Sequence, residues 1–289
     1  MCRLLALMVR MGLHVSIAGG MEKSVARAEE KGCNVFQIFS SNPRSWKTKP
    51  LSEGDAENFA AHFKSSGLDL AVDHMPYLPN LASPKDDVYA KSVDALATEL
   101  VRCKMLGIPF LVTHLGSHLG AGWETGLQRI VGAVDEAFSR ADNDVILLLE
   151  NTAGTKNSMG GSFQEVAAII NSLKAKQSRL GVCLDTCHLF AAGYELRTPE
   201  GLAQTLDQFK SNIKIEKLML IHLNDCRGEL GSHLDRHEHI GLGKIGEQGF
   251  RTILRNETVR GLPMILETPV DSRRDDLGNL NAARELASG

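Results

Sequence analysis

Residues 86–114, DDVYAKSVDALATELVRCKMLGIPFLVTH, join a long amphipathic stretch to a short apolar run that ends in histidine. The first part has the length and periodicity of a helix, and residues 110–114 have the length of a buried strand. Gly107 lies at the junction, as is typical of a helix C-terminal cap, and Gly32 and Gly67 follow two other helical stretches. A helix that leads directly into an apolar strand predicts parallel strands joined by crossovers.

The same unit recurs along the chain. Eight apolar runs alternate with helical stretches, at residues 13–17, 34–39, 70–74, 110–114, 145–150, 180–185, 218–222 and 264–267. This pattern predicts the α/β class and a single (β/α)₈ TIM barrel over residues 11–289, preceded by an N-terminal extension at residues 1–10. The competing open doubly wound sheet usually has a glycine-rich phosphate turn after an early strand, and HVSIAGGMEK (14–23) does not match that turn.

Composition narrows the class of protein. No apolar run approaches the roughly 18 residues needed to span a bilayer, so we expect no membrane partner. The six cysteines show no CxxC pair, which argues against disulfides and a cysteine zinc site and favours the cytoplasm. The net charge of −3 is a weak argument against nucleic acid, because domains that bind nucleic acid usually carry a basic surplus.

Polar residues end six of the eight apolar runs. They are His74, His114, Glu150, Asp185, His222 and Glu267. In a parallel barrel the C-terminal strand ends meet at one face, where such folds place their sites. Several carboxylates gathered there would repel one another, and a bound cation removes that cost. A single residue of this kind is more often a cap, and Asp185 with His188 could be only a helix N-cap and its neighbour.

A second group of polar residues lies in GSHLDRHEHIGLGKIG, residues 231–246, between the last two predicted strands. Asp235 and His237 are two positions apart in an extended segment, so their side chains point to the same side and could chelate one ion. His233 and His239 follow the same alternation. The loop alone therefore does not say which of the four residues bind.

The types of ligand indicate the metal and the chemistry. Imidazoles mixed with carboxylates suit zinc, manganese or iron better than magnesium or calcium, which prefer oxygen cages. Nine candidate ligands are too many for one tetrahedral ion and suit two or three ions that share a bridging carboxylate. Clustered divalent ions are a known solution for the hydrolysis of phosphate esters.

The chain resembles the endonuclease IV family of zinc-dependent apurinic/apyrimidinic endonucleases from about Gly12 to about Pro269. The resemblance is carried by HVSIAGG (14–20), NPRSW (42–46), PYLPNLASP (76–84), THLGSH (113–118), LLLENTAG (147–154), GVCLDTCHLFAAGY (181–194), IHLNDC (221–226), DRH (235–237) and ILETP (265–269). It implies a TIM barrel with three zinc ions, and manganese is able to occupy part of the site.

The resemblance also assigns residues to roles. It implies that His74, His114 and Glu150 bind one zinc and that Glu150 bridges to a second, which also takes Asp185, His222 and Glu267. The third zinc would take His188, Asp235 and His237. Glu267, which helps to position the attacking hydroxide, and Glu150 are the residues expected to be catalytic. Arg44, Tyr77 and Leu78 match the family residues that wedge into the DNA base stack.

The expected function is DNA repair in the base excision pathway. The enzyme, a deoxyribonuclease IV, would flip an abasic nucleotide out of duplex DNA and cleave the phosphodiester on its 5′ side, leaving a 3′-hydroxyl and a 5′-deoxyribose phosphate. We expect a monomer. Three bound divalent ions would make the loaded protein positive, which weakens the argument from charge against DNA. The alternatives are a metal-dependent sugar isomerase or epimerase of the xylose-isomerase-like barrels and a catalytically silent binder of damaged DNA.

Overall fold

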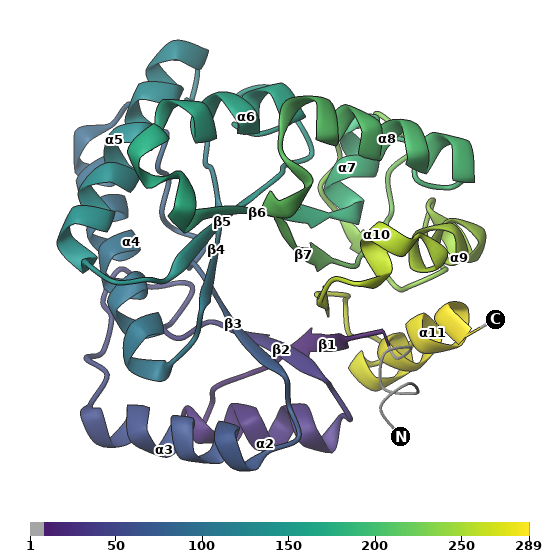
Figure 1. The fold of residues 1–289 in the computed structure, drawn as a ribbon, viewed down its shortest axis with the longest axis horizontal. Helices are drawn as coiled ribbons and strands as arrows, with labels where there is room; N and C mark the ends of the chain where they lie inside the picture. The colour runs from purple at the N-terminus through teal and green to yellow at the C-terminus, as the bar shows by residue number, and fades with distance from the viewer. Residues whose placement is uncertain (1–8, 289) are drawn as a thin grey trace.

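A closed barrel of eight parallel strands forms the centre of the molecule (Figure 1). The computed structural model describes residues 9–288. The strands are β1 (Met11–His14), β2 (Val35–Ile38), β3 (Leu70–His74), β4 (Phe110–His114), β5 (Ile146–Glu150), β6 (Leu180–Asp185), β7 (Leu218–His222) and β10 (Met264–Leu266). Each pairs with its neighbour in the chain, and β1 closes the ring against β10. The predicted (β/α)₈ barrel is therefore confirmed.

The predicted boundaries differ from the observed ones in a few places. β1 begins at Met11 and ends at His14, so the apolar run predicted at residues 13–17 continues into the loop after the strand. Helix α3 (Glu53–Ser65) is followed by Ser66 in an extended conformation, so the cap predicted at Gly67 is wrong. Gly107 does cap its helix, with a φ of 68° that favours glycine. Residues 1–8 of the predicted extension lie outside the described residues, and the division at residue 10 stays a prediction.

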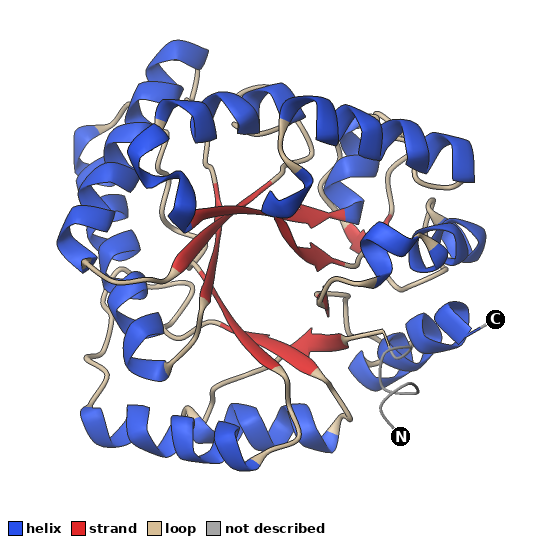
Figure 2. Cartoon of the chain, in the orientation of Figure 1, coloured by secondary structure: helices blue, strands red, loops and turns tan. Residues whose placement is uncertain are grey.

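Helices surround the barrel on all sides (Figure 2). The principal ones are α2 (Glu22–Glu30), α3 (Glu53–Ser65), α4 (Asp86–Leu106), α5 (Trp123–Ala141), α6 (Phe163–Ser172), α8 (Pro199–Asn212), α9 (Gly246–Arg255) and α11 (Asp276–Ser288), with shorter turns at η1 (Lys174–Arg179), α7 (Thr186–Ala192), η2 (Ile215–Lys217) and α10 (Glu257–Arg260). Several start at a side-chain cap, such as Ser162 before α6, whose hydroxyl accepts the backbone N–H of Glu165.

Two hydrophobic layers hold this arrangement together. The large layer packs the apolar faces of the helices against the outside of the barrel. A smaller layer fills the barrel interior with one residue from each of seven strands: Val35, Val72, Val112, Leu148, Cys183, Leu220 and Ile265. The barrel interior is therefore filled by apolar side chains. The polar side chains that come next along each strand must then lie at the C-terminal mouth of the barrel.

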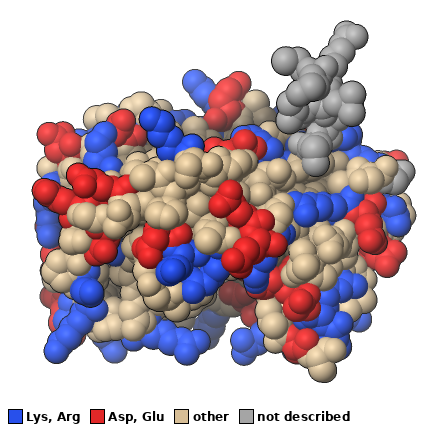
Figure 3. All heavy atoms as spheres, turned by 90° about the horizontal axis from the view of Figure 1, so that it is seen from below, with Lys and Arg blue, Asp and Glu red and all other residues tan. Residues whose placement is uncertain are grey.

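The surface carries charges of both signs. Figure 3 shows the face that lies below the barrel in Figure 1, where Lys and Arg side chains are interspersed with Asp and Glu. On this face the described Lys and Arg side chains form no continuous strip of the kind that follows a DNA backbone. Within residues 9–288, no helix combines the length and the apolar character needed to cross a membrane.

Candidate metal centre

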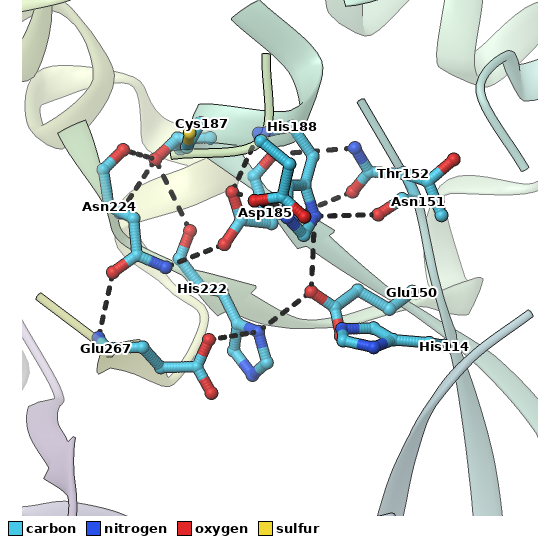
Figure 4. Close-up of polar contacts among 12 residues, drawn as sticks. His114, Glu150, Asn151, Thr152, Asp185, Cys187, His188, His222, Asn224 and Glu267 are labelled. Carbon is cyan, nitrogen blue, oxygen red and sulfur yellow. Dashed lines mark hydrogen bonds and ion pairs between the residues drawn. The ribbon is translucent and has the colours of Figure 1, made fainter. Parts of the chain in front are cut away.

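Imidazoles and carboxylates from all parts of the chain converge at the C-terminal mouth of the barrel (Figure 4). Three groups have ligand atoms within 4.8 Å of one another, and they share members: His74, His114 and Glu150; Glu150, Asp185, His222 and Glu267; and Asp185, His188 and His237. Eight of the nine predicted ligands lie in these groups. The ninth, Asp235, has its Oδ1 atom 3.2 Å from Nε2 of His188 and 4.0 Å from Nε2 of His237.

Glu150 lies at the centre of the cluster. Its side chain is fully buried, and each oxygen faces two imidazoles. Oε2 is 3.2 Å from Nε2 of His74 and 3.2 Å from Nε2 of His114. Oε1 is 3.3 Å from Nδ1 of His188 and 3.3 Å from Nδ1 of His222. A carboxylate with this arrangement can bridge two ions.

The electrostatics of the cluster favour bound positive charge. Burial opposes ionisation of Glu150, but the imidazoles of His114 and His222 outweigh it and hold the pKa of Glu150 well below its usual range. Burial also opposes ionisation of Glu267, and His222 is foremost among the groups that hold its pKa well below the usual range. Despite burial, the Glu150 carboxylate raises the pKa of His114. Divalent cations can take over the neutralising role of protonated imidazoles.

Asp185 is both a helix cap and a member of the cluster. As the N-cap of α7, its Oδ1 accepts the backbone N–H of His188 at 2.8 Å. Its Oδ2 accepts a hydrogen bond from the Asn224 side chain at 2.6 Å and lies 3.6 Å from Nε2 of His237. One carboxylate oxygen of Asp185 thus caps the helix while the other faces the cluster. The cap starts α7 at this point, and the three-residue spacing brings the side chain of His188 to the same site.

The loop between β7 and α9 resolves the alternatives that its sequence leaves open. Residues Asp225–Cys226 (β8) and His237–Glu238 (β9) form a small antiparallel sheet that turns His237 toward the cluster. Nδ1 of His233 contacts the carbonyl oxygen of Ala153 instead. His239 is buried away from the cluster against Asp271 and Asn279.

The hydrogen bonds of the histidines test whether the cluster fits a metal. Nδ1 of His74 donates to the carbonyl oxygen of Met75, and Nδ1 of His237 donates to that of Glu267. A nitrogen that donates to a carbonyl carries the proton, so the other ring nitrogen presents its lone pair to the cluster. Nε2 of His237 is buried without a hydrogen-bond partner. An orphaned lone pair aimed among carboxylates is what a metal ligand requires, so the residues fit a metal.

Three residues of the site were not predicted from the sequence. Nδ1 of His14 lies 3.7 Å from Oε1 of Glu267, and the Gln37 side chain contacts both residues. Asn224 donates to Asp185 and accepts the backbone N–H of Glu267. The available signals were the amide Gln37 between apolar neighbours in the run at residues 34–39 and the asparagine two positions after His222.

The loops that carry the predicted DNA-contacting residues lie side by side next to the cluster. The backbone N–H of Tyr77 donates to the carbonyl oxygen of Pro43, one residue before Arg44. Phe39 packs between the rings of His74 and Tyr77, with centroid distances of 5.4 and 4.9 Å. Tyr77 is 58% exposed and Leu78 is 38% exposed, so neither is an ordinary core residue.

A buried ion pair on α4 anchors the loop that carries Arg44. The Glu99 carboxylate accepts the hydroxyls of Ser40 and Ser41 at 2.5 Å each. Arg102 lies beside it, with Nε 3.6 Å from Oε2 of Glu99, and donates to the carbonyl oxygens of Ser40 and Lys49. The two residues therefore fasten both ends of the loop to the helix.

Replacing Arg102 by Met is expected to destabilise the protein by about 3–5 kcal/mol, because it leaves the Glu99 carboxylate buried without its partner. Arg140→Met is the matched control: Arg140 is exposed, and its ion pair with Asp94 is worth at most about 1 kcal/mol. Urea unfolding followed by circular dichroism measures both. Equal losses for the two variants would contradict the anchoring role.

Comparisons with known proteins agree with this geometry. A family model described as "Xylose isomerase-like TIM barrel" matches residues 25–288. The protein called "Probable endonuclease 4" of Methanoculleus marisnigri is 57% identical over 281 residues, which cover 97% of this chain and 99% of the relative. The protein of the same name from Cenarchaeum symbiosum is 51% identical, with coverage of 96% and 100%.

Solved structures extend the likeness to three dimensions. Endonuclease IV from Thermus thermophilus superposes with a TM-score of 0.85 at 36% identity, covering 96% of this chain and 99% of that one. A D-tagatose 3-epimerase-like protein has a TM-score of 0.68 at 19% identity, with 96% of each chain covered, and this likeness shows the fold alone. The chain therefore belongs to the endonuclease IV family, the deoxyribonuclease IV enzymes, within the xylose isomerase-like TIM barrels.

Proposed function

We propose that this enzyme repairs DNA by hydrolysing the phosphodiester on the 5′ side of abasic sites in duplex DNA. The products are a 3′-hydroxyl and a 5′-deoxyribose phosphate. The observation that carries the proposal is the convergence of three overlapping ligand groups around Glu150 at the barrel mouth, in a chain of the endonuclease IV family. Overlapping groups of this kind suit a cluster of ions that share carboxylates.

The cofactor we propose is three zinc ions per chain, with manganese able to replace part of them. His74, His114 and Glu150 would hold the first ion. Glu150, Asp185, His222 and Glu267 would hold the second, and His188, Asp235 and His237 the third. When bound, such ions supply an activated water near neutral pH and stabilise the departing oxygen of a phosphate ester. The proposed ligands are imidazoles and carboxylates without a thiolate, a set that suits zinc and manganese.

Among the carboxylates of the second ligand group, Glu267 is the one suited to act on the reacting water. Its side chain is about one-fifth exposed, whereas Glu150 and Asp185 are fully buried. It can therefore face both the ions and an incoming phosphodiester. The backbone N–H of Glu267, held by Asn224, and its Oε1, held by Gln37, fix where the carboxylate points. The buried Glu150 would act by holding ions together.

The nucleotide would reach this pocket by flipping out of the duplex. Exposed Tyr77 and Leu78, with the exposed Arg44 beside them, could fill the space that the flipped nucleotide leaves in the base stack. Such a wedge offsets part of the unstacking cost, which is lowest at an abasic site because no base has to be unpaired.

Replacing Tyr77 by Ala should weaken binding to an abasic-site duplex by roughly tenfold or more, because stacking of an aromatic side chain on a base is worth about 1–3 kcal/mol. A 2-aminopurine placed next to the lesion should also show a smaller fluorescence change. Leu277→Ala removes an apolar side chain on α11 that is 42% exposed and serves as the control. Unchanged affinity and fluorescence in the Tyr77 variant would rule out the wedge.

We also propose that the enzyme works as a monomer in base excision repair in the cytoplasm. The five cysteines within the described residues are buried and free, which is compatible with a reducing compartment. The net charge of −3 leaves the bound ions as the main attraction for a phosphate.

Metal analysis combined with a nicking assay tests the proposed function. The substrate is a duplex with a tetrahydrofuran abasic analogue, which lacks the aldehyde that a lyase needs. We expect divalent metal in the purified protein, nicking that is lost after prolonged chelation and restored by zinc, and a 3′ end that a polymerase extends. Tight binding without nicking would favour a silent damage binder. One metal per chain with interconversion of sugars, and no nicking, would favour the isomerase alternative.

A further inference from the structure

Gln37 is a fully buried amide in the middle of an apolar strand. It lies on β2 two residues after Val35, so both side chains project to the same side, into the barrel. Val35 belongs to the apolar interior layer, and Gln37 is one layer nearer the mouth, paired in register with His14 of β1 and Val72 of β3. A buried amide at this depth needs partners on other strands.

Gln37 finds three partners, all of them ring or carboxylate groups of the site. Its Nε2 donates to Oε1 of Glu267 at 2.6 Å and lies 3.0 Å from Nδ1 of His14. Its Oε1 lies 2.9 Å from Nε2 of His222. The contact with Glu267 fixes which way the amide faces, because a carboxylate only accepts hydrogen bonds and must meet the NH₂ end. The carbonyl end therefore faces His222.

This orientation determines the tautomer of His222. A carbonyl oxygen at 2.9 Å requires a proton on Nε2 of His222, so the neutral ring that a metal needs carries its lone pair on Nδ1. Nδ1 lies 3.3 Å from Oε1 of Glu150 and 3.3 Å from Oε2 of Glu267, inside the second ligand group. In His74 and His237 a backbone carbonyl oxygen fixes the tautomer in the same way, by accepting the proton on Nδ1. In His222 the accepting carbonyl oxygen is that of the Gln37 side chain.

We propose that Gln37 is a positioning residue for the metal centre, which orients His222 to bind through Nδ1 and fixes the direction of the Glu267 carboxylate. It acts on two groups of the second ligand set at once, from a strand that contributes no ligand itself. This inference rests on the proposed function, since it requires that these groups bind a metal. Such outer partners typically change metal affinity by about 10–100-fold when removed.

Zinc release tests the proposal independently of catalysis. The zinc-loaded protein and its Gln37→Met variant, which keeps the size of the side chain but loses the hydrogen bonds to Glu267, His222 and His14, are mixed with a chromophoric chelator. We expect at least one zinc to leave the variant about 10–100 times faster than the wild type. Val35→Ala, on the same strand and face, controls for general loosening of the barrel interior and is expected to release zinc at nearly the wild-type rate. Equal release from wild type and Gln37→Met would overturn the inference.

A second measurement needs no variant of Gln37. Long-range ¹H–¹⁵N correlation of histidine in the zinc-loaded wild type, with His222 assigned by its absence in His222→Asn, reports which nitrogen carries the proton. A proton on Nε2 supports the inference, and zinc on Nε2 overturns it. Failure of the wild type to hold zinc at all would instead count against the proposed function, so the two failures are distinguishable.

Discussion

Replacing Glu267 by Gln is expected to slow nicking of an abasic-site duplex by about a thousandfold or more, which is about 4 kcal/mol of lost transition-state stabilisation. The change keeps the size and shape of the side chain but removes its charge. Glu267 is the clustered carboxylate that is both partly exposed and within reach of His222, with its Oε2 3.3 Å from Nδ1 of that residue. An amide there neither orients an attacking water as a base nor neutralises a bound ion. Single-turnover cleavage with excess enzyme measures the effect on chemistry.

The control for Glu267→Gln is the same substitution at Glu195, whose carboxylate pairs with Arg197 at 2.6 Å and has no contact with the ligand groups among the described residues. Glu195→Gln is expected to cleave at nearly the wild-type rate. Metal analysis of both variants separates a direct role in the reaction from loss of an ion. If Glu267→Gln cleaves within tenfold of the wild type, the role proposed for Glu267 is wrong.

The barrel and its strand-end side chains could be predicted because each depends on a local pattern. His74, His114, Asp185 and His222 each end an apolar run, and each is the last residue of its strand in the structure. Glu267 follows the last strand by one residue. Parallel pairing then brings these ends together without any further information, since the C-terminal ends of a parallel barrel share one face.

In the loop between β7 and α9, local sequence patterns do not identify the ligands. Four residues share one alternation there, and two of them, His233 and His239, turn to other partners. The choice depends on the pairing of β8 with β9, in which Cys226 lies opposite His237. That pairing joins segments separated by a loop whose path no local pattern specifies.

Partners of the ligands are harder still to predict. Gln37 contacts Glu267 and His222 across the barrel, at sequence separations of 230 and 185 residues. An amide in an apolar run indicates only that some partner exists. Its identity follows from the register of all the strands between them, which the structure supplies.

Glu150→Gln is expected to have the broadest effect of any single substitution, with loss of more than one metal per chain and of nearly all nicking. The Glu150 carboxylate belongs to two of the three ligand groups and faces four imidazoles at 3.2–3.3 Å. An amide lacks the charge that balances two ions, and its NH₂ group would point at ring nitrogens or at the metal. In the proposed arrangement the shared Glu150 would couple the ions, so that loosening one site would loosen its neighbour.

Glu99→Gln is the matched control for this effect, because Glu99 is equally buried and also ion-paired but lies on α4, outside the ligand groups. We expect Glu99→Gln to be less stable in urea yet to keep its metal. Glu150→Gln should instead lose metal on dialysis, as measured by elemental analysis, and should recover little nicking when zinc is added back. Full metal content in Glu150→Gln would mean that the ions are held independently, and the shared-carboxylate arrangement would then have to be abandoned.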